Sequence, residues 1–306
     1  MHINPENIRK YISDKEYRFM KNGLMGFYRS MPDEKYLRLM YKARTGSYLH
    51  LQNPKSFNEK IQWLKLYDRN PMYHLMVDKY ESKRYVSSII GEEYVIPTLN
   101  IWDKVEDIDF SSLPLQFVLK CTHDSHGIVI CKDKNKLDTA KAKKVLKKGL
   151  KRDYYLPYRE WVYKDLPHRI LAEEFISDDE STPADYKVHN FNGEPKIILV
   201  CKGRYEDEGL TEDFYDSEWN HLDVKRPHIP NAKEPTPKPD LLEELLEISR
   251  KLSQGIPFVR TDFYISKGRL LFGEMTFYPA SGFETFVPNS FDSILGDYLS
   301  LPNTIE

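Results

Sequence analysis

Cysteine is scarce in this sequence, with three residues among 306. Cys121, Cys131 and Cys201 are far apart and form no CxxC pair, so the spacing supports neither a disulfide framework nor a cysteine-based zinc site. Three thiols cannot all pair with one another. We therefore expect buried, reduced thiols and a reducing compartment.

Long apolar runs and a strong net charge are missing as well. No stretch approaches the roughly 20 apolar residues that a transmembrane helix needs, and residues 1–5 lack the apolar run of a signal peptide. The formal net charge is −2, which gives no overall attraction to nucleic acid or anionic lipid. We expect a cytoplasmic protein with no membrane span and no nucleic-acid partner.

Apolar and aromatic residues, in contrast, are abundant enough for a folded core, at 40% and 13% of the chain. Residues 1–50 and 56–90 show helical patterns, and Ser56 with Glu59 three residues later predicts a capping box. Most predicted strands come later, and a lysine-rich helix is predicted over 132–152. The predicted strands cover 94–99, 117–121, 128–131, 169–176, 185–191 and 196–201, with Asn192-Gly193 predicting a hairpin turn between the last two. Helices followed by a strand-rich half with interleaved helices predict an α+β fold.

The most informative segment is a predicted β-hairpin over residues 258–276 that carries Arg260, Asp262, Glu274 and Thr276 among apolar residues. Because side chains alternate along a strand, Arg260 and Asp262 share one face, and Glu274 and Thr276 share one face of the second strand. Two carboxylates in apolar surroundings repel each other unless a cation lies between them. Carboxylates on rigid strands suit Mg²⁺ bound together with nucleotide phosphates. The alternative is an ordinary ion pair on a solvated sheet face.

The register of this hairpin decides whether Asp262 and Glu274 meet. A two-residue turn closed by Ser266 and Arg269 with regular pairing puts them on opposite faces. We therefore expect an irregularity, for example a bulge at Gly268, that brings both carboxylates to one face.

Three further features lie upstream of the hairpin. Lys120 ends an apolar strand beside a turn-prone loop, where an ammonium suits phosphate oxygens. Glu173 to Ile176 end another strand with two acids. Asp185 and Lys187 are two residues apart and share one face of the next strand. In isolation, a solvated lysine and a surface ion pair explain Lys120 and the Asp185–Lys187 pair equally well.

Taken together, these features resemble the ATP-grasp superfamily, and more closely the TupA-like ATP-grasp family, which is associated with teichuronopeptide and other bacterial surface-polysaccharide synthesis. The resemblance runs from about residue 53 to 297. It rests on Asn53-Pro-Lys-Ser-Phe-Asn-Glu-Lys-Ile-Gln-Trp-Leu-Lys, Asp78-Lys-Tyr, Arg84-Tyr-Val, Phe117-Val-Leu-Lys-Cys-Thr-His, Arg169-Ile-Leu-Ala-Glu-Glu, Asp185-Tyr-Lys, Phe191-Asn-Gly, Phe214-Tyr-Asp, Arg260-Thr-Asp-Phe-Tyr and Gly273-Glu-Met-Thr.

The resemblance implies a role for each matching residue. ATP and Mg²⁺ are the implied cofactors, with Arg260 and Lys120 as catalytic residues. The implied contacts are Lys120 and Lys187 with the phosphates, Ser125 and Gly127 in the loop that covers them, Glu173 or Glu174 with Phe175 and Ile176 at adenine, Asp185 at ribose, and Asp262, Glu274 and Thr276 at the metal. The candidates for binding the substrate carboxylate are Lys79, Arg84 and His123, and a structural role explains each of them equally well.

The resemblance also implies three regions and a reaction. The regions are a mainly helical one with the first strands over 1–110, a lid subdomain over 111–177 and a C-terminal subdomain with the metal site over 178–306. The nucleotide is expected between the two subdomains. The reaction is ATP-dependent amide formation through an acyl phosphate, from a uronic acid of a capsule or other surface polysaccharide and an amine, with polysaccharide assembly enzymes as implied partners.

The sequence departs from the family pattern at two places. Thr276 stands where many ATP-grasp enzymes have asparagine, and a hydroxyl is a weaker metal ligand. The loop 122–127 has fewer glycines than usual, and Asp124 would repel a triphosphate if it pointed inward.

Two other functions stay open at this point. Asp107-Ile-Asp109 resembles the Asp-x-Asp metal motif of glycosyltransferases, although no apolar strand precedes it. A non-catalytic protein that retains ATP binding is the third possibility.

Overall fold

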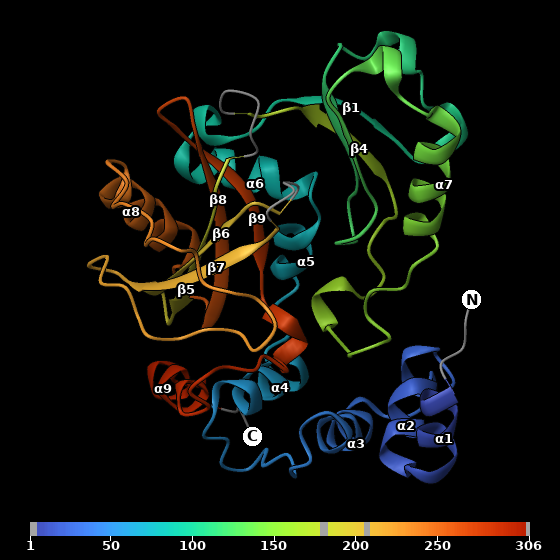
Figure 1. Cartoon of the computed structure of the whole chain (residues 1–306), viewed down its shortest axis with the longest axis vertical. Helices are drawn as coiled ribbons and strands as arrows, with labels where there is room; N and C mark the ends of the chain where they lie inside the picture. Colours follow the sequence, from blue (N-terminus) through green and yellow to red (C-terminus); the bar gives the residue numbers. More distant parts are fainter. Residues whose placement is uncertain (1–4, 178–182, 205–208, 304–306) are drawn as a thin grey trace.

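The computed structural model describes residues 5–177, 183–204 and 209–303. Within these residues the strands form two antiparallel sheets, a small one with the order β1-β4-β2-β3 and a large one with the order β7-β6-β5-β8-β9. Figure 1 shows the two sheets side by side, with α7 on the outer side of the small sheet and α8 on the outer side of the large sheet. The helices α1 to α3 form a separate layer at one end of the molecule.

The elements have the following bounds. The helices are α1 Pro5–Ser13, α2 Lys15–Leu24, α3 Asp33–Thr45, α4 Phe57–Tyr67, α5 Met72–Val77, α6 Glu81–Ile90, α7 Thr139–Leu150, α8 Leu242–Ser253 and α9 Phe291–Tyr298. The strands are β1 Thr98–Trp102, β2 Phe117–Cys121, β3 Ile128–Cys131, β4 Ile170–Glu174, β5 Asp185–Phe191, β6 Glu194–Lys202, β7 Thr211–Asp216, β8 Phe258–Ser266 and β9 Arg269–Thr276.

The small sheet has a hydrophobic core of its own under α7. Phe117, Leu119 and Cys121 of β2 pack in this core with Leu146 of α7. Because strand side chains alternate, Val118 and Lys120 project from the opposite face of β2, toward the large sheet.

The large sheet buries its outer face under α8. Leu245 and Leu252 of α8 belong to the main core, together with Val259 and Phe263 of β8. Arg260 and Asp262 alternate with these core residues and therefore face the small sheet.

A buried hydrogen-bond network fixes α8 to two central strands of the large sheet. Asn190 of β5 donates to the Val259 carbonyl at 3.0 Å and to Thr261 Oγ1 at 3.2 Å, and Ser249 of α8 donates to Asn190 Oδ1 at 2.8 Å. Such fully paired buried polar groups specify one register, so β5 and β8 present their inner faces in a fixed relation.

The α+β fold expected from the sequence is confirmed, and several of its local details are too. Ser56 and Glu59 form the capping box at the start of α4, and Asn192 and Gly193 make the tight turn between β5 and β6 with φ values of 51° and 85°. The strand expected over 94–99 is shifted: a 3₁₀ turn covers Glu92–Tyr94 and β1 begins at Thr98.

The domain boundaries stay predictions. The one at 177/178 falls at the edge of the described residues. None of the helices within the described part of the chain is long and apolar enough to cross a membrane.

Candidate active site

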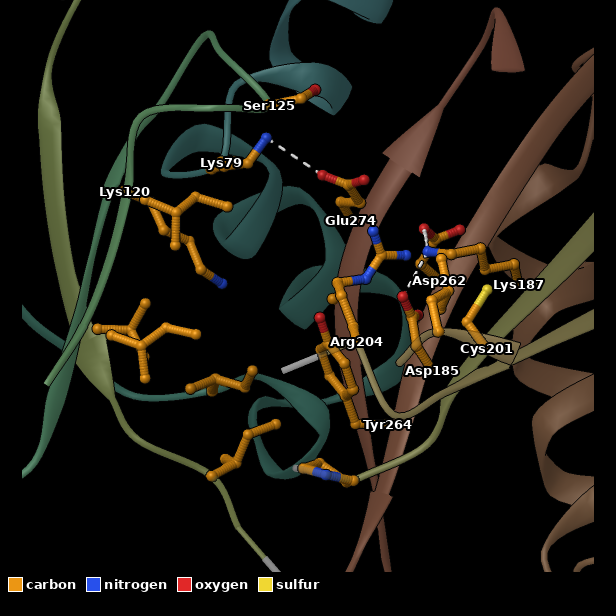
Figure 2. A pocket seen from close by; sticks show the side chains of 18 of the residues that line it. Lys79, Lys120, Ser125, Asp185, Lys187, Cys201, Arg204, Asp262, Tyr264 and Glu274 are labelled. Atoms are coloured by element: carbon orange, nitrogen blue, oxygen red, sulfur yellow. Dashed lines mark hydrogen bonds and ion pairs between the residues drawn. The ribbon is translucent and has the colours of Figure 1, made fainter. Parts of the chain in front are cut away.

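A cavity of about 470 Å³ lies between the two sheets. Figure 2 shows side chains from both sheets pointing into it, with Lys120 on one side and Asp262, Lys187 and Glu274 on the other. The residues expected from the sequence that line it are Lys79, Lys120, Ser125, Glu173, Glu174, Phe175, Ile176, Asp185, Lys187, Arg260, Asp262 and Glu274. The cavity thus brings together residues that are up to 195 positions apart in the chain, from Lys79 to Glu274.

The wall from the small sheet is mostly apolar. Val118, Ile128 and Ile130 line it, and Ile96 adds to it from the segment before β1. All three strand residues occupy the face opposite the α7 core, as the alternation of β2 and β3 requires. A flat aromatic ligand finds an apolar surface here.

Lys120 interrupts this apolar wall. Its ammonium forms an ion pair with Glu173 of the neighbouring strand β4, and Lys83 of α6 pairs with the same carboxylate at 2.9 Å. Burial alone would raise the pKa of Glu173, but the charges and hydrogen bonds of Lys120 and Lys83 outweigh it and lower that pKa below its ordinary value. Glu173 therefore stays ionised and positions Lys120 at the cavity.

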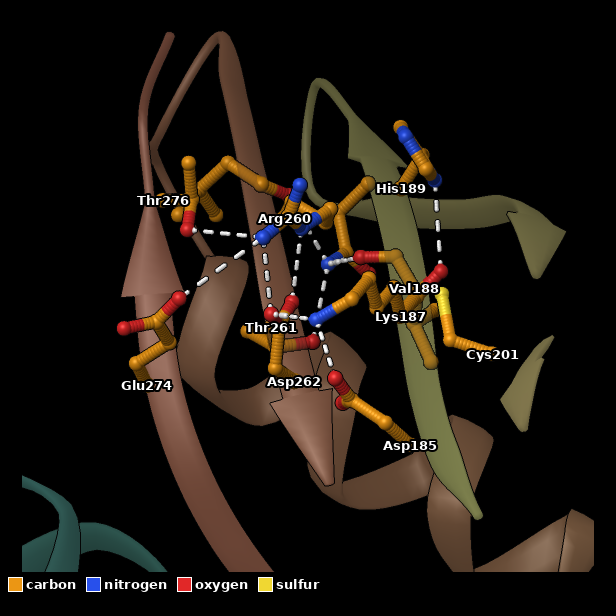
Figure 3. Close-up of polar contacts among 12 residues, drawn as sticks. Asp185, Lys187, Val188, His189, Cys201, Arg260, Thr261, Asp262, Glu274 and Thr276 are labelled. Carbon is orange, nitrogen blue, oxygen red and sulfur yellow. Dashed lines mark hydrogen bonds and ion pairs between the residues drawn. The ribbon is translucent and has the colours of Figure 1, made fainter. Parts of the chain in front are cut away.

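The wall from the large sheet carries a buried cluster of charges (Figure 3). Arg260 donates to both oxygens of Asp262, each at 2.7 Å. Lys187 pairs with Asp262 at 2.5 Å and with Asp185 at 2.5 Å. Bidentate, charge-assisted contacts of this kind hold side chains in fixed positions. Lys187 and Arg260 both have pKa values above their ordinary range, because these carboxylates outweigh the effect of burial.

The hairpin β8–β9 brings its two carboxylates to one face by a bulge, but not at the expected place. The turn is the two-residue Lys267-Gly268, closed by Ser266 opposite Arg269. The register shifts between Asp262 and Phe263, so that Asp262 pairs with Glu274. The proposed bulge at Gly268 is therefore wrong.

Gly273 is the extra residue of this bulge, since Phe272 pairs with Phe263 and Glu274 with Asp262. A Cβ at Gly273 would lie 3.1 Å from the Asp262 carbonyl oxygen and 3.1 Å from the Tyr264 ring. Glycine thus permits the close approach that puts Glu274 beside Asp262.

Glu274 is held from the other side of the cavity by Lys79, at 3.1 Å. The Lys79 backbone N–H also donates to the Thr122 carbonyl at 3.0 Å, so this lysine joins the loop after β2 to the large sheet. Burial would raise the pKa of Glu274, but the Lys79, Lys187 and Arg260 charges lower it to about 2. Glu274 is fully ionised at neutral pH.

The donor set fits Mg²⁺ bound with phosphates. Asp262 and Glu274 are cross-strand partners with oxygen ligands of the type that Mg²⁺ prefers. Asp185 Oδ1, which is buried at the same cavity, has no hydrogen-bond partner within residues 5–177, 183–204 and 209–303. Among the described residues, no three His, Cys, Asp or Glu side chains converge as a complete metal site. Mg²⁺ commonly takes one or two carboxylates and completes its shell with substrate phosphates and water, so such a partial site is appropriate.

The loop 122–127 turns its acid away from the cavity. Asp124 is buried and forms an ion pair with Arg152, whereas Ser125 lines the cavity. Gly127 does not line the cavity. A Cβ there would lie 2.5 Å from Cys121 Sγ, which shows how tightly this end of the loop packs.

Three other expected residues lie outside the cavity. Arg84 is exposed on α6, and His123 is buried and stacked on His168 with ring centroids 3.6 Å apart. Thr276 accepts a hydrogen bond from Arg260 at 3.1 Å and lines a neighbouring cavity instead.

Sequence reasoning missed several residues of the cavity. Lys83 does not line the cavity but pairs with Glu173, and it has no distinguishing pattern on its helix. At the β6–β7 end, Arg226 forms ion pairs with Glu212, at 3.1 Å, and with Glu284. Arg226 and Glu212 line the cavity. The strand β7 was not predicted, and its sequence, Thr211-Glu-Asp-Phe-Tyr-Asp216, has no alternation of apolar and polar residues that would indicate a strand. Cys201, Arg204 and Tyr264 also line the cavity.

Many solved structures are similar to the chain, and three of them serve as examples. A D-alanine–D-alanine ligase from Bacillus anthracis complexed with ATP has 17% identity and a TM-score of 0.43, over 74% of this chain and 63% of that one. The D-alanine–D-alanine ligase from Helicobacter pylori has 14% identity and a TM-score of 0.43, over 81% and 68%. The D-cycloserine synthetase DcsG has 11% identity and a TM-score of 0.42, over 74% and 70%.

The chain spans 63% of the length of the Bacillus anthracis protein. No curated protein matches it. The family described as TupA-like ATPgrasp matches residues 59–300, which is most of the chain and includes every residue that lines the cavity. The chain belongs to the TupA-like ATP-grasp family, as its motifs predicted.

Proposed function

We propose that the protein is an Mg²⁺-dependent carboxylate–amine ligase that uses ATP to form an amide. The observation that carries this proposal is that Lys120 of the small sheet and Asp262 and Glu274 of the large sheet line one cavity. A triphosphate with its metal needs such an arrangement of cations and carboxylates at short range.

In this proposal, adenine lies against the apolar wall of the small sheet. Val118, Ile128 and Ile130 supply the apolar contacts, and the end of β4 at Glu174 and Phe175 supplies polar edges for the base. Asp185 was expected at ribose. Its ion pair with Lys187, beside Asp262, fits the phosphate end of the nucleotide better.

The phosphates extend from this wall toward the large sheet. Lys120 and Lys187 contact them, and Ser125 covers them from the loop after β2. Asp262 and Glu274 hold Mg²⁺, which supplies charge neutralisation at the phosphate oxygens. Thr276 stays bound to Arg260 and orients that guanidinium rather than ligating the metal.

The reaction then proceeds in two steps. The substrate carboxylate attacks the γ-phosphorus, the bond to the β-phosphate oxygen breaks, and ADP leaves with the electron pair. An amine attacks the acyl carbon of the acyl phosphate, and phosphate leaves. Arg260 and Lys120 offset the charge that develops on the transferring phosphoryl oxygens, and their ion pairs hold them in place beforehand.

We further propose a uronic acid of a surface polysaccharide, or of its precursor, as the carboxylate. The family association supports this choice. Lys79 is the best-placed residue for the sugar carboxylate, because it reaches the cavity beside Glu274. The exposure of Arg84 and the burial of His123 make both less suitable.

A glycosyltransferase would need Asp107 and Asp109 at its metal. Both side chains are exposed outside the cavity, and Asp109 accepts from the Ser111 backbone N–H at 2.9 Å as a local cap. This geometry favours a structural role for the Asp-x-Asp segment. A non-catalytic ATP-binding protein would keep the cavity, and only turnover distinguishes it from a ligase.

The test is an ADP-release screen with ATP, Mg²⁺, hydroxylamine and a set of uronic acids that includes free and UDP-linked glucuronic and galacturonic acid. Hydroxylamine traps an acyl phosphate as a hydroxamate, whose mass is that of acid plus hydroxylamine minus water. The proposal expects ADP and hydroxamate in equal amounts. Release of UDP would support the glycosyltransferase, and ATP binding with no product from any acid would support the non-catalytic protein.

A further inference from the structure

A second cavity, of about 160 Å³, adjoins the first on the side of the bulged hairpin. Ser125, Arg260 and Glu274 line both cavities, so the two meet at the residues proposed to handle the transferring phosphoryl group. The other residues that line it are Tyr154, Glu160, Tyr163, Thr276, Tyr278, Pro279, Ala280 and Ser281. With the nucleotide placed as proposed above, a group bound there would lie next to the acyl carbon.

Glu160 is the unusual residue of this second cavity. It is buried, with 4% of its surface exposed, and accepts a hydrogen bond from Ser281 Oγ at 2.5 Å. Among the described residues it has no ion-pair partner, in contrast to Glu173, Asp262 and Glu274. A buried carboxylate without a cation is costly, and a cationic ligand removes that cost.

The nearest candidate cation, Lys65 of α4, has its hydrogen bonds elsewhere. It donates to Gln62 Oε1 at 3.0 Å, to the Tyr158 carbonyl at 3.0 Å and to the Ser281 carbonyl at 2.8 Å. These three acceptors use all three donors of an ammonium. Lys65 thus holds the segment around Ser281 in place and donates no hydrogen bond to the Glu160 carboxylate, which lines the cavity.

The backbone around Ser281 is strained in a way that builds this site. Ala280, Ser281 and Gly282 all have left-handed φ values, of 46°, 57° and 64°. This run turns the Ser281 hydroxyl to Glu160 and its carbonyl to Lys65. Non-glycine residues in this region cost about 1–3 kcal/mol each and are concentrated at functional sites.

We propose that the second cavity binds the amine substrate as its ammonium, with Glu160 as the residue that holds the ammonium and takes its proton. This inference rests on the proposed ligase function and adds the place of the second substrate. A carboxylate substrate is excluded from this position by the charge of Glu160. Tyr154, Tyr163 and Tyr278 also line this cavity, and aromatic rings attract an ammonium.

The chemistry balances without another reactant. Glu160 takes one proton from the ammonium, and the freed lone pair attacks the acyl carbon, forming the C–N bond. The C–O bond to phosphate breaks, and phosphate leaves with that electron pair and the second proton of the nitrogen. Glu160 then returns its proton to solvent. The net products are amide, hydrogen phosphate and one proton.

The ionisation of the groups around Glu160 is compatible with Glu160 accepting a proton near neutral pH. Burial raises the pKa values of Tyr154, Tyr163 and Tyr278, so these phenols stay protonated. Burial also raises the pKa of Glu160 and lowers that of Lys65, each partly opposed by the charge of the other. Glu274 stays ionised and Arg260 stays charged at the boundary of the two cavities.

The test compares two nucleophiles in Glu160→Gln, which keeps the size of the side chain. Hydroxylamine is uncharged at neutral pH and needs no base, whereas glycinamide and ethanolamine present a primary ammonium and carry no carboxylate. We expect Glu160→Gln to lower kcat/KM for the ammonium substrate by about 10²-fold or more, with the hydroxylamine reaction unchanged. Glu243→Gln, at an exposed position on α8, is the matched control and should change neither.

The outcomes separate this inference from the ligase proposal. If wild-type protein makes no hydroxamate from any acid, the ligase proposal fails. If it makes hydroxamate and Glu160→Gln treats both nucleophiles as wild type does, or if no ammonium probe reacts at all, the second cavity does not serve the amine. Should Glu160→Gln fail to fold, Glu160→Asp decides: its shorter carboxylate should raise KM for the ammonium substrate and leave the hydroxylamine reaction unchanged.

Discussion

The two sheets enclose the same cavity with opposite chemistry. The small sheet contributes an apolar surface with one ion pair, Lys120 and Glu173, and with Glu174, whereas the large sheet contributes a largely buried cluster of two cations and three carboxylates on β5, β8 and β9. In both sheets, side chains alternate along each strand between a face that packs in a hydrophobic core and a face that lines the cavity. The difference lies in which residues fill the cavity-facing positions.

This comparison separates two tasks. A surface of Val118, Ile128 and Ile130 holds a flat base by contact area alone and tolerates small shifts. The cluster around Asp262 works only with fixed geometry, because a buried charge without its partner is destabilising. We therefore expect substitutions in the large sheet mainly to lower kcat. Substitutions in the small sheet should mainly raise the dissociation constant for ATP.

The largest effect is expected for Asp262→Asn. The neutral amide cannot ligate Mg²⁺ as the carboxylate does, and it leaves Arg260 without its bidentate partner. We expect a loss of about 10²–10³-fold or more in kcat, together with a lower midpoint of thermal unfolding. Steady-state ADP release and calorimetry measure the two effects. Activity like that of wild type would remove Asp262 from the metal site.

Lys120→Met tests the contribution of the small sheet and should weaken ATP binding. The loss of one charge-assisted contact to phosphate costs about 1.5–3 kcal/mol, which corresponds to a dissociation constant for ATP that is higher by roughly 10- to 100-fold. Lys83 still pairs with Glu173, so the fold should persist. Isothermal titration with ATP and Mg²⁺ measures the change. An unchanged ATP affinity would place the phosphates away from Lys120.

Gly273→Ala sharpens the comparison at the hairpin itself. The added methyl group presses on the Asp262 carbonyl and the Tyr264 ring and shifts Glu274 away from Asp262. Because small displacements of positioning groups are costly for catalysis, we expect about a 10-fold or larger loss of kcat. The matched control is Gly268→Ala in the turn of the same hairpin, where φ is +70° and the added Cβ meets nothing. It should lower the free energy of unfolding by about 1–2 kcal/mol and leave kcat unchanged.

The smallest effect concerns pH. Burial raises the pKa of Glu274, but the Lys79, Lys187 and Arg260 charges lower it from 4.5 to about 2. The folded-state pKa is thus below the unfolded value, so this contribution to stability is present above pH 4.5 and is lost as the pH falls toward 2. Glu274 is about one-third exposed, at 34%, so solvent screens the effect. Lys79→Met should raise the Glu274 pKa in a carbon-13 carboxyl titration and flatten the fall in stability below pH 4.5. A pKa unchanged by the substitution would exclude Lys79 as its cause.

Much of this arrangement could be predicted from local sequence. Alternation predicted that Arg260 and Asp262 share one face, and Asn192-Gly193 predicted the turn between β5 and β6. These features depend on neighbouring residues, for which strand and turn preferences are sufficient. Family motifs predicted that Lys120 and Glu274 belong to one site.

Other features depend on contacts between distant segments. The bulge at Gly273 arises from the close approach of two strands. A glycine inside a strand pattern indicates a bulge, but the bulge was expected only at Gly268 in the turn. Glu160 lies in an irregular segment, and its lack of a cation is visible only when α4 and the segment around Ser281 are in place. Asp124 points away from the cavity because it forms an ion pair with Arg152, which lies 28 residues later in the chain. It therefore does not repel a triphosphate.

The most direct measurement is a crystal structure with a non-hydrolysable ATP analogue and Mn²⁺ in place of Mg²⁺. The account predicts an anomalous manganese peak between the Asp262 and Glu274 carboxylates, with the triphosphate reaching Lys120 and the base against β2 and β3. A nucleotide bound elsewhere, or one whose metal contacts neither carboxylate, would contradict it.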